Sequence, residues 1–392
     1  MKIQISFLGK ARLDAKTGYR SARYSFQNGT EAEAVFLGPE IARIERPEIF
    51  YILGTAGSMW DMLLDHYGAD TEDENTILEL WEQAKNETVT EELLSRFEPI
   101  LSKKLGVTCC LRVISYAKNE AEQAGLLARL AEWLHKDDEL VLDVTHGLRH
   151  LPMLMLAASH YLEQVRGVKV KEIYYGALEM TADGKTPVLS LKGMLRILDW
   201  VQALAADNSS GNYGVFQDLL VASNMAPAVS QSLADAAYFE RITNPIKAKE
   251  KLTKTQPEIE KLSDPLAALF RHELIARTNW WRNGQRGDWE SKLAWRWFNS
   301  RDYLRAVIYT QEAMISLNVE NAHINSFPDR EEAREKLKDN PQAKQLFKLR
   351  NALAHGVVSQ DQKTNQLLAN EQSLRSELEH LMQVLLKPSV PG

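Results

Sequence analysis

The stretch Leu140-Val141-Leu142-Asp143-Val144-Thr145-His146-Gly147-Leu148-Arg149-His150 decides the fold of the first half of the chain. It begins as an aliphatic run without in/out alternation, which is typical of a parallel strand covered on both faces. A glycine-containing loop follows, and then residues 151–165, whose apolar spacing of three and four predicts a helix. Strand, loop and helix in this order form the repeating unit of a doubly wound parallel sheet.

The same order recurs on both sides of this stretch. Further strands are predicted at residues 3–8, 49–53, 108–114 and 172–175, and further helices at residues 58–66, 91–105 and 120–134. Asn28-Gly29 indicates a hairpin turn, an antiparallel excursion near the start. We therefore expect an α/β domain with a Rossmann-like, doubly wound sheet and right-handed crossovers.

The second half of the chain changes character at the polar, turn-rich residues 206–212. Beyond this stretch no strands are predicted. Six helical segments are predicted, at residues 213–223, 228–241, 265–282, 303–317, 342–355 and 373–386. The expected organisation is an α/β domain over residues 1–208 and an all-α domain over residues 209–392.

Composition excludes several classes of protein. The net charge of the 392 residues is −6, which excludes a polycation that coats nucleic acid or acidic membranes. Residues 1–210 carry 23 Lys and Arg against 31 Asp and Glu, whereas residues 211–392 carry 24 against 22. Two cysteines, Cys109 and Cys110, are too few for zinc fingers, iron–sulfur clusters or a disulfide framework. With no signal peptide and no apolar run of membrane-spanning length, we expect a cytoplasmic protein that does not bind membranes.

A tryptophan- and arginine-rich stretch marks the helical half. It contains Trp280, Trp281, Trp289, Trp295 and Trp297, interleaved with Arg277, Arg282, Arg286, Arg296 and Arg301. One interpretation is an aromatic and basic surface for single-stranded nucleic acid. We favour the other, in which the tryptophans fill the core and the arginines reach solvent, because so many exposed indoles would endanger solubility.

Small and polar residues follow several of the predicted strands. In an open parallel sheet these positions gather at one edge, where ligands bind. Glycines there allow close approach of the backbone, and a helix N-terminus favours an anion. We predict a pocket for phosphates and bases formed by Gly9, Lys10, Gly54, Thr55, Ala56, Gly57, Ser58, Thr145, His146, Gly147, Arg149 and Gly176.

A metal site is the weaker hypothesis for the same region. His146 and His150 are four residues apart and have Asp143 nearby, a spacing that permits a shared ligand face on a helix. No third His or Cys stands at a useful spacing, and the side chains of Cys109 and Cys110 point to opposite faces of a strand. We therefore expect no metal, with His146 contacting a ligand. Neither a Walker-type phosphate loop nor a Gly-x-Gly-x-x-Gly pattern is present.

The helical half contains the sequence Arg350-Asn351-Ala352-Leu353-Ala354-His355-Gly356 on a predicted amphipathic helix. Asn351 and His355 are four residues apart and share a face. Histidine can move a proton near neutral pH, and arginine can stabilise charge on a phosphorane, so the set suits metal-free cleavage of RNA by its own 2′-hydroxyl. The alternative is an ordinary helix end, because Arg-x-x-x-x-His is common by chance.

The first half resembles the CARF domain, the sensor domain of type III CRISPR-associated proteins. The resemblance rests on residues 5–9, 52–61, 143–152 and 173–179, above all on the pattern Asp-x-Thr-His-Gly-x-Arg-His-x-Pro in residues 143–152. The second half is similar to a HEPN ribonuclease domain, whose motif of Arg, a polar residue and His is matched by Arg350, Asn351 and His355. Lys10 departs from the small or hydroxyl residue of many relatives.

The resemblance implies an endoribonuclease that cleaves single-stranded RNA without a metal and leaves 2′,3′-cyclic phosphate ends. Its activator would be a cyclic oligoadenylate, a tetra- or hexa-adenylate, bound by a homodimer, with the catalytic residues of two chains meeting in one site. No other cofactor is implied. Two alternatives stay open, a ring nuclease that degrades the activator in the sensor pocket and a ligand sensor without catalytic activity.

Overall fold

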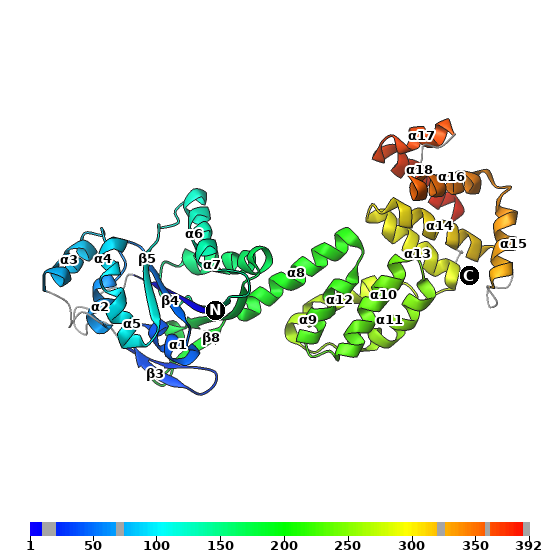
Figure 1. Cartoon of the computed structure of the whole chain (residues 1–392). Coiled ribbons are helices and arrows are strands. Elements are labelled where there is room, and N and C mark those ends of the chain that lie inside the picture. The colour runs from blue at the N-terminus through cyan, green and yellow to red at the C-terminus, as the bar shows by residue number, and fades with distance from the viewer. Residues whose placement is uncertain (10–20, 68–73, 320–325, 357–360, 387–392) are drawn as a thin grey trace. The chain divides into compact units, whose positions relative to one another are not determined.

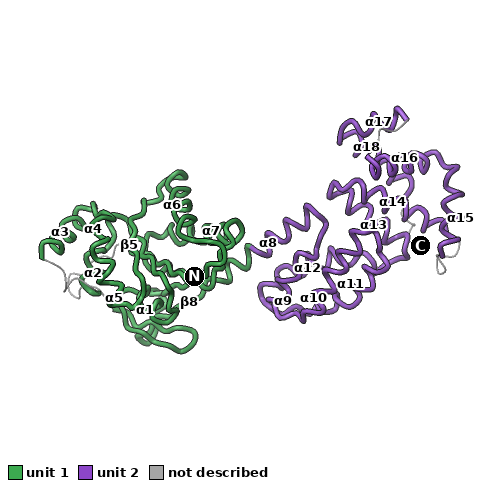
Figure 2. Tube along the Cα trace, viewed as in Figure 1, with its two compact units in different colours: residues 1–198 green, residues 199–392 purple. Residues whose placement is uncertain are grey.

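The computed structural model describes residues 1–9, 21–67, 74–319, 326–356 and 361–386 (Figure 1). The chain divides into two compact units, Met1–Leu198 and Asp199–Gly392 (Figure 2). The division lies inside helix α8 (Lys192–Ser210), earlier than the expected boundary at residue 208. The polar residues expected to form a turn continue this helix as far as Ser210, and the hydroxyls of Ser209 and Ser210 donate to the carbonyl of Ala206 in its last turn.

Five parallel strands form the centre of unit 1, and all five were predicted. They are β1 (Lys2–Leu8), β4 (Ile49–Gly54), β5 (Thr108–Val113), β6 (Glu139–Asp143) and β7 (Lys169–Gly176). Among the described residues the full sheet has the order β3-β2-β8-β7-β6-β1-β4-β5. The chain proceeds from β1 to β4 and β5 on one side and returns to β6 and β7 on the other. The order of the strands therefore reverses between β1 and β6, which is where doubly wound sheets bind ligands.

The remaining strands extend the sheet at its β7 edge. The predicted hairpin is present as β2 (Ala22–Ser25) and β3 (Glu31–Ala34), which pair antiparallel. Strand β8 (Thr186–Ser190) joins the hairpin to β7. The sequence did not predict β8, because a five-residue run that contains Pro187 has too little apolar pattern to stand out from a loop.

Helices cover both faces of the sheet, as the lack of alternation in the strands predicts. Alternate residues of β1, Ile3 and Ile5, pack on one face with α6 (Glu120–Trp133) and α7 (His150–Tyr161). The other face is covered by α1 (Leu37–Glu45), α2 (Trp60–Tyr67) and the short helices α3 (Glu74–Lys85), α4 (Glu91–Ser95) and α5 (Glu98–Leu105). Cys109 and Cys110 lie against opposite faces, as predicted.

Unit 2 is built from helices around its own apolar core, as expected. The described helices after α8 are α9 (Gln217–Ala222), α10 (Pro227–Arg241), α11 (Pro245–Glu260), α12 (Pro265–Thr278), α13 (Arg286–Asn299), α14 (Tyr303–Leu317), α15 (Phe327–Leu337), α16 (Pro341–His355), α17 (Gln362–Leu368) and α18 (Glu371–Leu385). Helices α11, α13, α15 and α17 were not predicted. Helices α11 and α15 have few apolar residues, so apolar spacing reveals little of them.

In the tryptophan- and arginine-rich stretch, the prediction for the tryptophans is confirmed and the prediction for the arginines is only partly correct. Trp280 and Trp297 are buried, and the other three tryptophans pack against the same core. The arginines were expected at solvent, but two of them are only partly exposed and pair with buried carboxylates: Arg277 contacts Asp207, and Arg296 contacts Glu240 and Asp207. Both carboxylates are buried, and a buried charged group requires a partner of opposite charge within hydrogen-bond distance.

Candidate ligand pocket and candidate catalytic helix

The loops after β1 and β6 touch at the point where the strand order reverses. A methyl group on Gly9 would lie 2.7 Å from the backbone nitrogen of Gly147, so the two backbones meet without room for a side chain. Gly147 has a φ of +128°, a conformation that L side chains rarely adopt. The two predicted glycines therefore shape this edge. Lys10, which follows Gly9, lies outside the described residues.

The loop after β4 is held to the end of β1 by its own polar groups. The hydroxyl of Ser58 donates to the carbonyl of Leu8 and accepts a hydrogen bond from the backbone of Thr55. The backbone nitrogen of Met59 donates to the carbonyl of Gly9. Thr55 and Ser58 are buried, so they position the loop. Of the predicted loop residues, Ala56 is the more exposed one.

Two glycines of the predicted pocket are required for packing. A methyl group on Gly54 would lie 2.6 Å from the indole of Trp60, and one on Gly176 would lie 2.7 Å from Tyr24. The backbone nitrogen of Gly176 donates to the hydroxyl of Thr145, which ties the end of β7 to the loop after β6. These contacts place the four strand ends against one another.

His146 is held by a backbone group on the facing helix. Its Nε2 accepts a hydrogen bond from the backbone nitrogen of Leu37 at 3.4 Å, and its ring lies edge-on to Phe36. Burial lowers the pKa of His146 and raises the pKa of the neighbouring Asp143. The ring is therefore neutral at neutral pH and positioned at the switch point of the sheet.

The positions of His146 and His150 do not support the metal hypothesis. His146 lies in the loop, whereas His150 is the first residue of α7 and its Nε2 lies 2.8 Å from the carbonyl oxygen of Tyr116. The two imidazoles thus engage separate backbone groups. Arg149, the remaining predicted residue of this loop, is exposed and available to an anionic ligand.

Two residues at this edge were not predicted. A methyl group on Gly57 would lie 2.9 Å from a carboxylate oxygen of Glu87 and 2.9 Å from the hydroxyl of Tyr116. The Tyr116 hydroxyl also donates to Glu87 at 3.2 Å. Tyr116 follows strand β5. It could therefore have been predicted by the same rule as the other loops, which selects residues just after the end of a parallel strand. Glu87 comes from the end of α3 and has no sequence signal.

The three candidate catalytic residues lie on α16. Asn340 caps its N-terminus, and Ala343, Leu346 and Leu349 anchor one side of it in the core. Asn351 and His355 are exposed and Arg350 is partly exposed, and Arg350 donates a hydrogen bond from Nη1 to Oδ1 of Asn351 at 3.0 Å. His355 is the last helical residue before Gly356, whose left-handed conformation ends the helix. The structure thus brings Arg350 and Asn351 into contact and leaves His355 exposed at the end of the same helix.

Comparison with known proteins identifies the first unit. Residues 3–179 match the family model described as CRISPR system endoribonuclease Csx1, CARF domain. The chain is also similar to CRISPR-associated protein MJ1674 of Methanocaldococcus jannaschii, with 26% identity over 306 residues. That alignment covers 68% of this chain and 48% of the relative, so the chain spans about half the length of that protein.

No helix among the described residues has the length and apolarity that crossing a bilayer requires. The matched residues contain the five parallel strands and every loop of the candidate pocket. CARF domains bind cyclic oligoadenylates. Residues 3–179 are thus similar to the CARF domain of CRISPR-associated proteins.

Proposed function

We propose that the chain is an endoribonuclease of type III CRISPR defence, activated by a cyclic oligoadenylate and independent of metal. The observation that carries the proposal is the exposed set of Arg350, Asn351 and His355 at the end of α16, in a chain whose other half is a CARF domain. The alternative, an ordinary helix end, does not require Arg350 and His355 to be exposed beside a polar residue such as Asn351.

The chemistry follows from the three side chains. A 2′-hydroxyl of the RNA attacks the adjacent phosphodiester, which yields a 2′,3′-cyclic phosphate and a 5′-hydroxyl. His355 moves the proton, and the guanidinium of Arg350 stabilises the negative charge of the transition state. Asn351 accepts a hydrogen bond from Arg350 and so fixes the direction of the guanidinium. One α16 supplies a single histidine, whereas the reaction has one proton to remove and one to donate.

A homodimer would supply the second set. In this proposal the CARF domains pair across the ligand, and the loops around Gly57 and Gly147 of both chains hold its phosphates and adenines. Apolar side chains lie beside these loops: Met153 on α7 is 76% exposed, and Leu178 and Met180, just after β7, are 45% and 58% exposed. Exposed apolar side chains that gather on a surface are typical of an interaction site, and we propose that these three do so in the dimer. Ligand binding then shifts the population of active arrangements.

The ring-nuclease alternative needs a nucleophile or a base in the CARF pocket. The hydroxyls of Thr55 and Ser58 are buried and within 3.3 Å of each other, and Nε2 of His146 accepts a hydrogen bond from Leu37. These groups are engaged by the protein, which weighs against the alternative. Incubation of each cyclic oligoadenylate with the protein, followed by a search for linear products, tests it directly.

The decisive experiment is cleavage of a labelled single-stranded RNA by the full chain in EDTA, with cyclic tetra- and hexa-adenylate compared. We expect cleavage only with an activator, and products ending in a 2′,3′-cyclic phosphate. His355→Ala should lower the rate by about 100-fold or more, since general acid–base catalysis contributes on that order. His380→Ala, which removes another exposed histidine, should leave the rate unchanged. Cleavage that persists in His355→Ala would contradict the assignment, and a chain that binds activator without cleaving RNA would be a sensor.

A further inference from the structure

The helical unit contains a groove that the proposed function does not use. It has a volume of about 710 Å³ and lies where the end of α8, the end of α12 and one side of α13 meet. Pockets that hold small ligands have volumes of about 300–1,000 Å³. The residues that matter for the argument are Asn208, Arg277, Trp280, Lys292, Trp295 and Asn299.

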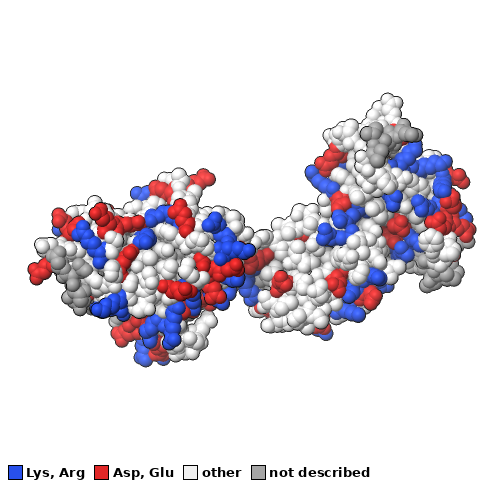
Figure 3. Space-filling model, in the orientation of Figure 1, with Lys and Arg blue, Asp and Glu red and all other residues white. Residues whose placement is uncertain are grey.

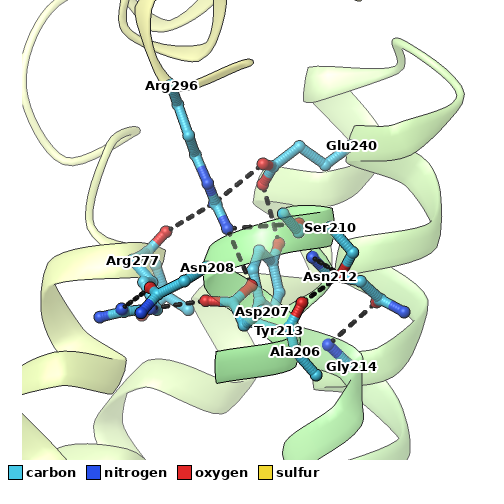
Figure 4. A network of polar contacts seen from close by, with 12 residues as sticks. Ala206, Asp207, Asn208, Ser210, Asn212, Tyr213, Gly214, Glu240, Arg277 and Arg296 are labelled. Atoms are coloured by element: carbon cyan, nitrogen blue, oxygen red, sulfur yellow. Dashed lines mark hydrogen bonds and ion pairs between the residues drawn. The ribbon is translucent and has the colours of Figure 1, made fainter. Parts of the chain in front are cut away.

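One wall of the groove is a set of ion pairs that already balance one another (Figure 4). Nε of Arg277 donates to Asp207 at 2.5 Å, and Arg277 also donates to the side-chain oxygen of Asn208. Arg296 donates to Glu240 at 2.9 Å and lies 3.4 Å from Asp207. Arg277 also pairs with Glu273, so the two arginines of this wall face three carboxylates and offer no free positive charge.

Among the described residues, Lys292 is the cation of the groove that forms no ion pair with a carboxylate. Its Nζ donates to the carbonyl oxygens of Trp280 at 3.1 Å and Asn283 at 3.2 Å. Within the described part of the chain no carboxylate oxygen forms an ion pair with it. Because the side chain is exposed, an incoming anion can reach it. Lys292 is therefore the side chain of the groove that can offer its positive charge to a ligand.

The side of α13 that faces the groove presents three kinds of group. Lys292, Trp295 and Asn299 stand at positions i, i+3 and i+7, which lie on one side of a helix. Trp295 is partly buried, and its indole packs edge to face with the ring of Phe298 at 5.7 Å, which holds it in place. One cation, one fixed aromatic ring and exposed amides match one phosphate, one base and the polar edge of that base.

We propose that this groove binds a nucleotide, with its phosphate on Lys292 and its base against Trp295. The nucleotide comes from a single-stranded RNA or is free in solution, since both offer the same chemistry. Acidic and basic residues are interspersed on the face drawn in Figure 3. The site is separate from the exposed set on α16 and requires no cleavage.

The test uses the full chain carrying His355→Ala, which protects the RNA in case the chain cleaves it. Binding of a fluorescein-labelled 12-nucleotide RNA is measured by anisotropy in EDTA over a range of salt concentrations. Lys292→Gln should weaken binding by about three- to tenfold and lower the slope of log affinity against log salt by about 0.7 to 0.9, the loss of one phosphate contact. Trp295→Leu should weaken binding by roughly tenfold with an unchanged slope.

The matched control is Lys254→Gln on α11, which removes an exposed lysine outside the groove and gives the same change of net charge. Equal affinity and salt slope for Lys292→Gln and Lys254→Gln, together with an unchanged affinity of Trp295→Leu, would overturn the proposal. Circular dichroism verifies that each variant folds. Competition with 5′-AMP separates the two sources: displacement of the RNA indicates a site for a free nucleotide, and no displacement indicates an RNA strand. If the RNase assay fails while the groove variants act as described, the groove stands without the nuclease.

Discussion

Glu240 shows at the scale of one residue how the helical unit keeps a charge in its core. The side chain has no exposed surface. It accepts hydrogen bonds from Tyr213 at 3.0 Å, Trp280 at 3.1 Å and Arg296 at 2.9 Å. Burial raises the pKa of Glu240 and Arg296 counteracts this effect. Donors from α13, the loop after α12 and the segment before α9 thus converge on a single carboxylate of α10.

Replacing Glu240 by alanine should therefore destabilise unit 2 strongly. The change leaves a buried guanidinium without its nearest carboxylate and two buried donors without an acceptor, so we expect a loss of about 3–5 kcal/mol in the free energy of unfolding. Urea unfolding followed by tryptophan fluorescence measures it, because most tryptophans of the chain lie in this unit. Glu258→Ala, at an exposed site on α11, should change stability by less than about 0.5 kcal/mol. Equal losses for the two variants would contradict the role of Glu240.

His146 makes the stability of the CARF domain depend on pH. Burial lowers its pKa in the folded chain, whereas the unfolded chain titrates near pH 6.5. Below that pH the unfolded state binds more protons, so stability falls as pH falls from about 6.5 towards the lowered pKa. The raised pKa of Asp143 has the opposite sign, because the folded chain then holds a proton that the unfolded chain releases.

His146→Gln keeps a hydrogen-bond acceptor for Leu37 and removes the titration. Its thermal unfolding, measured by calorimetry between pH 7 and pH 5, should show a smaller loss of stability on acidification than that of the unchanged chain. A loss that is as large in the variant as in the unchanged chain would assign the pH dependence to other groups.

At the scale of elements, the pocket is made by contacts between loops. Each loop was predicted from its own strand, and the prediction that they meet at one edge follows from parallel pairing. The sequence did not reveal which side chains serve the fold: Thr55 and Ser58 hold the loop after β4, and Gly176 makes room for Tyr24. Such roles depend on neighbours from distant segments, so no local pattern records them.

The close contact between Gly9 and Gly147 predicts that replacing Gly9 by alanine has a different effect from replacing a glycine that has no close neighbour. Gly9→Ala places a methyl group 2.7 Å from the backbone of Gly147, which has no flexible side chain to move aside. We expect a loss of about 1–3 kcal/mol in stability and weaker binding of cyclic oligoadenylate. Gly125→Ala, in the middle of α6 with nothing within 4 Å, should stabilise the chain by about 0.5–1 kcal/mol. Thermal unfolding and calorimetric titration measure both effects; a neutral Gly9→Ala would show that the loops can separate freely.

At the scale of the whole molecule, each of the two units buries its own apolar core. Either unit alone is incomplete for the proposed function, because the activator binds in one and the exposed Arg350 and His355 lie in the other. Dimerisation would complete both sites at once. The proposed dimerisation can be tested by replacing the exposed apolar side chains beside the ligand loops.

Met153→Glu should weaken the proposed homodimer. A carboxylate at this position would lose its hydration when the dimer forms. We therefore expect the dissociation constant of the dimer to rise by about tenfold or more. Analytical ultracentrifugation of the full chain measures the association. Leu269→Glu on α12, another apolar side chain that is 70% exposed, serves as the control. An unchanged association constant for Met153→Glu would move the interface elsewhere.

The sequence by itself determined the class of each half, the five parallel strands and the exposed helix that ends at His355. Hydrophobic spacing and loop glycines are local properties of the chain, which is why they can be read without a structure. Only the tertiary structure decided that Arg296 turns inward to Glu240 and Asp207, that Tyr116 and Glu87 reach Gly57, and that Lys292 faces a groove without a carboxylate partner. Each of these depends on the distance between segments far apart in the chain, and the free energy of a buried or unpaired charge is set by that distance.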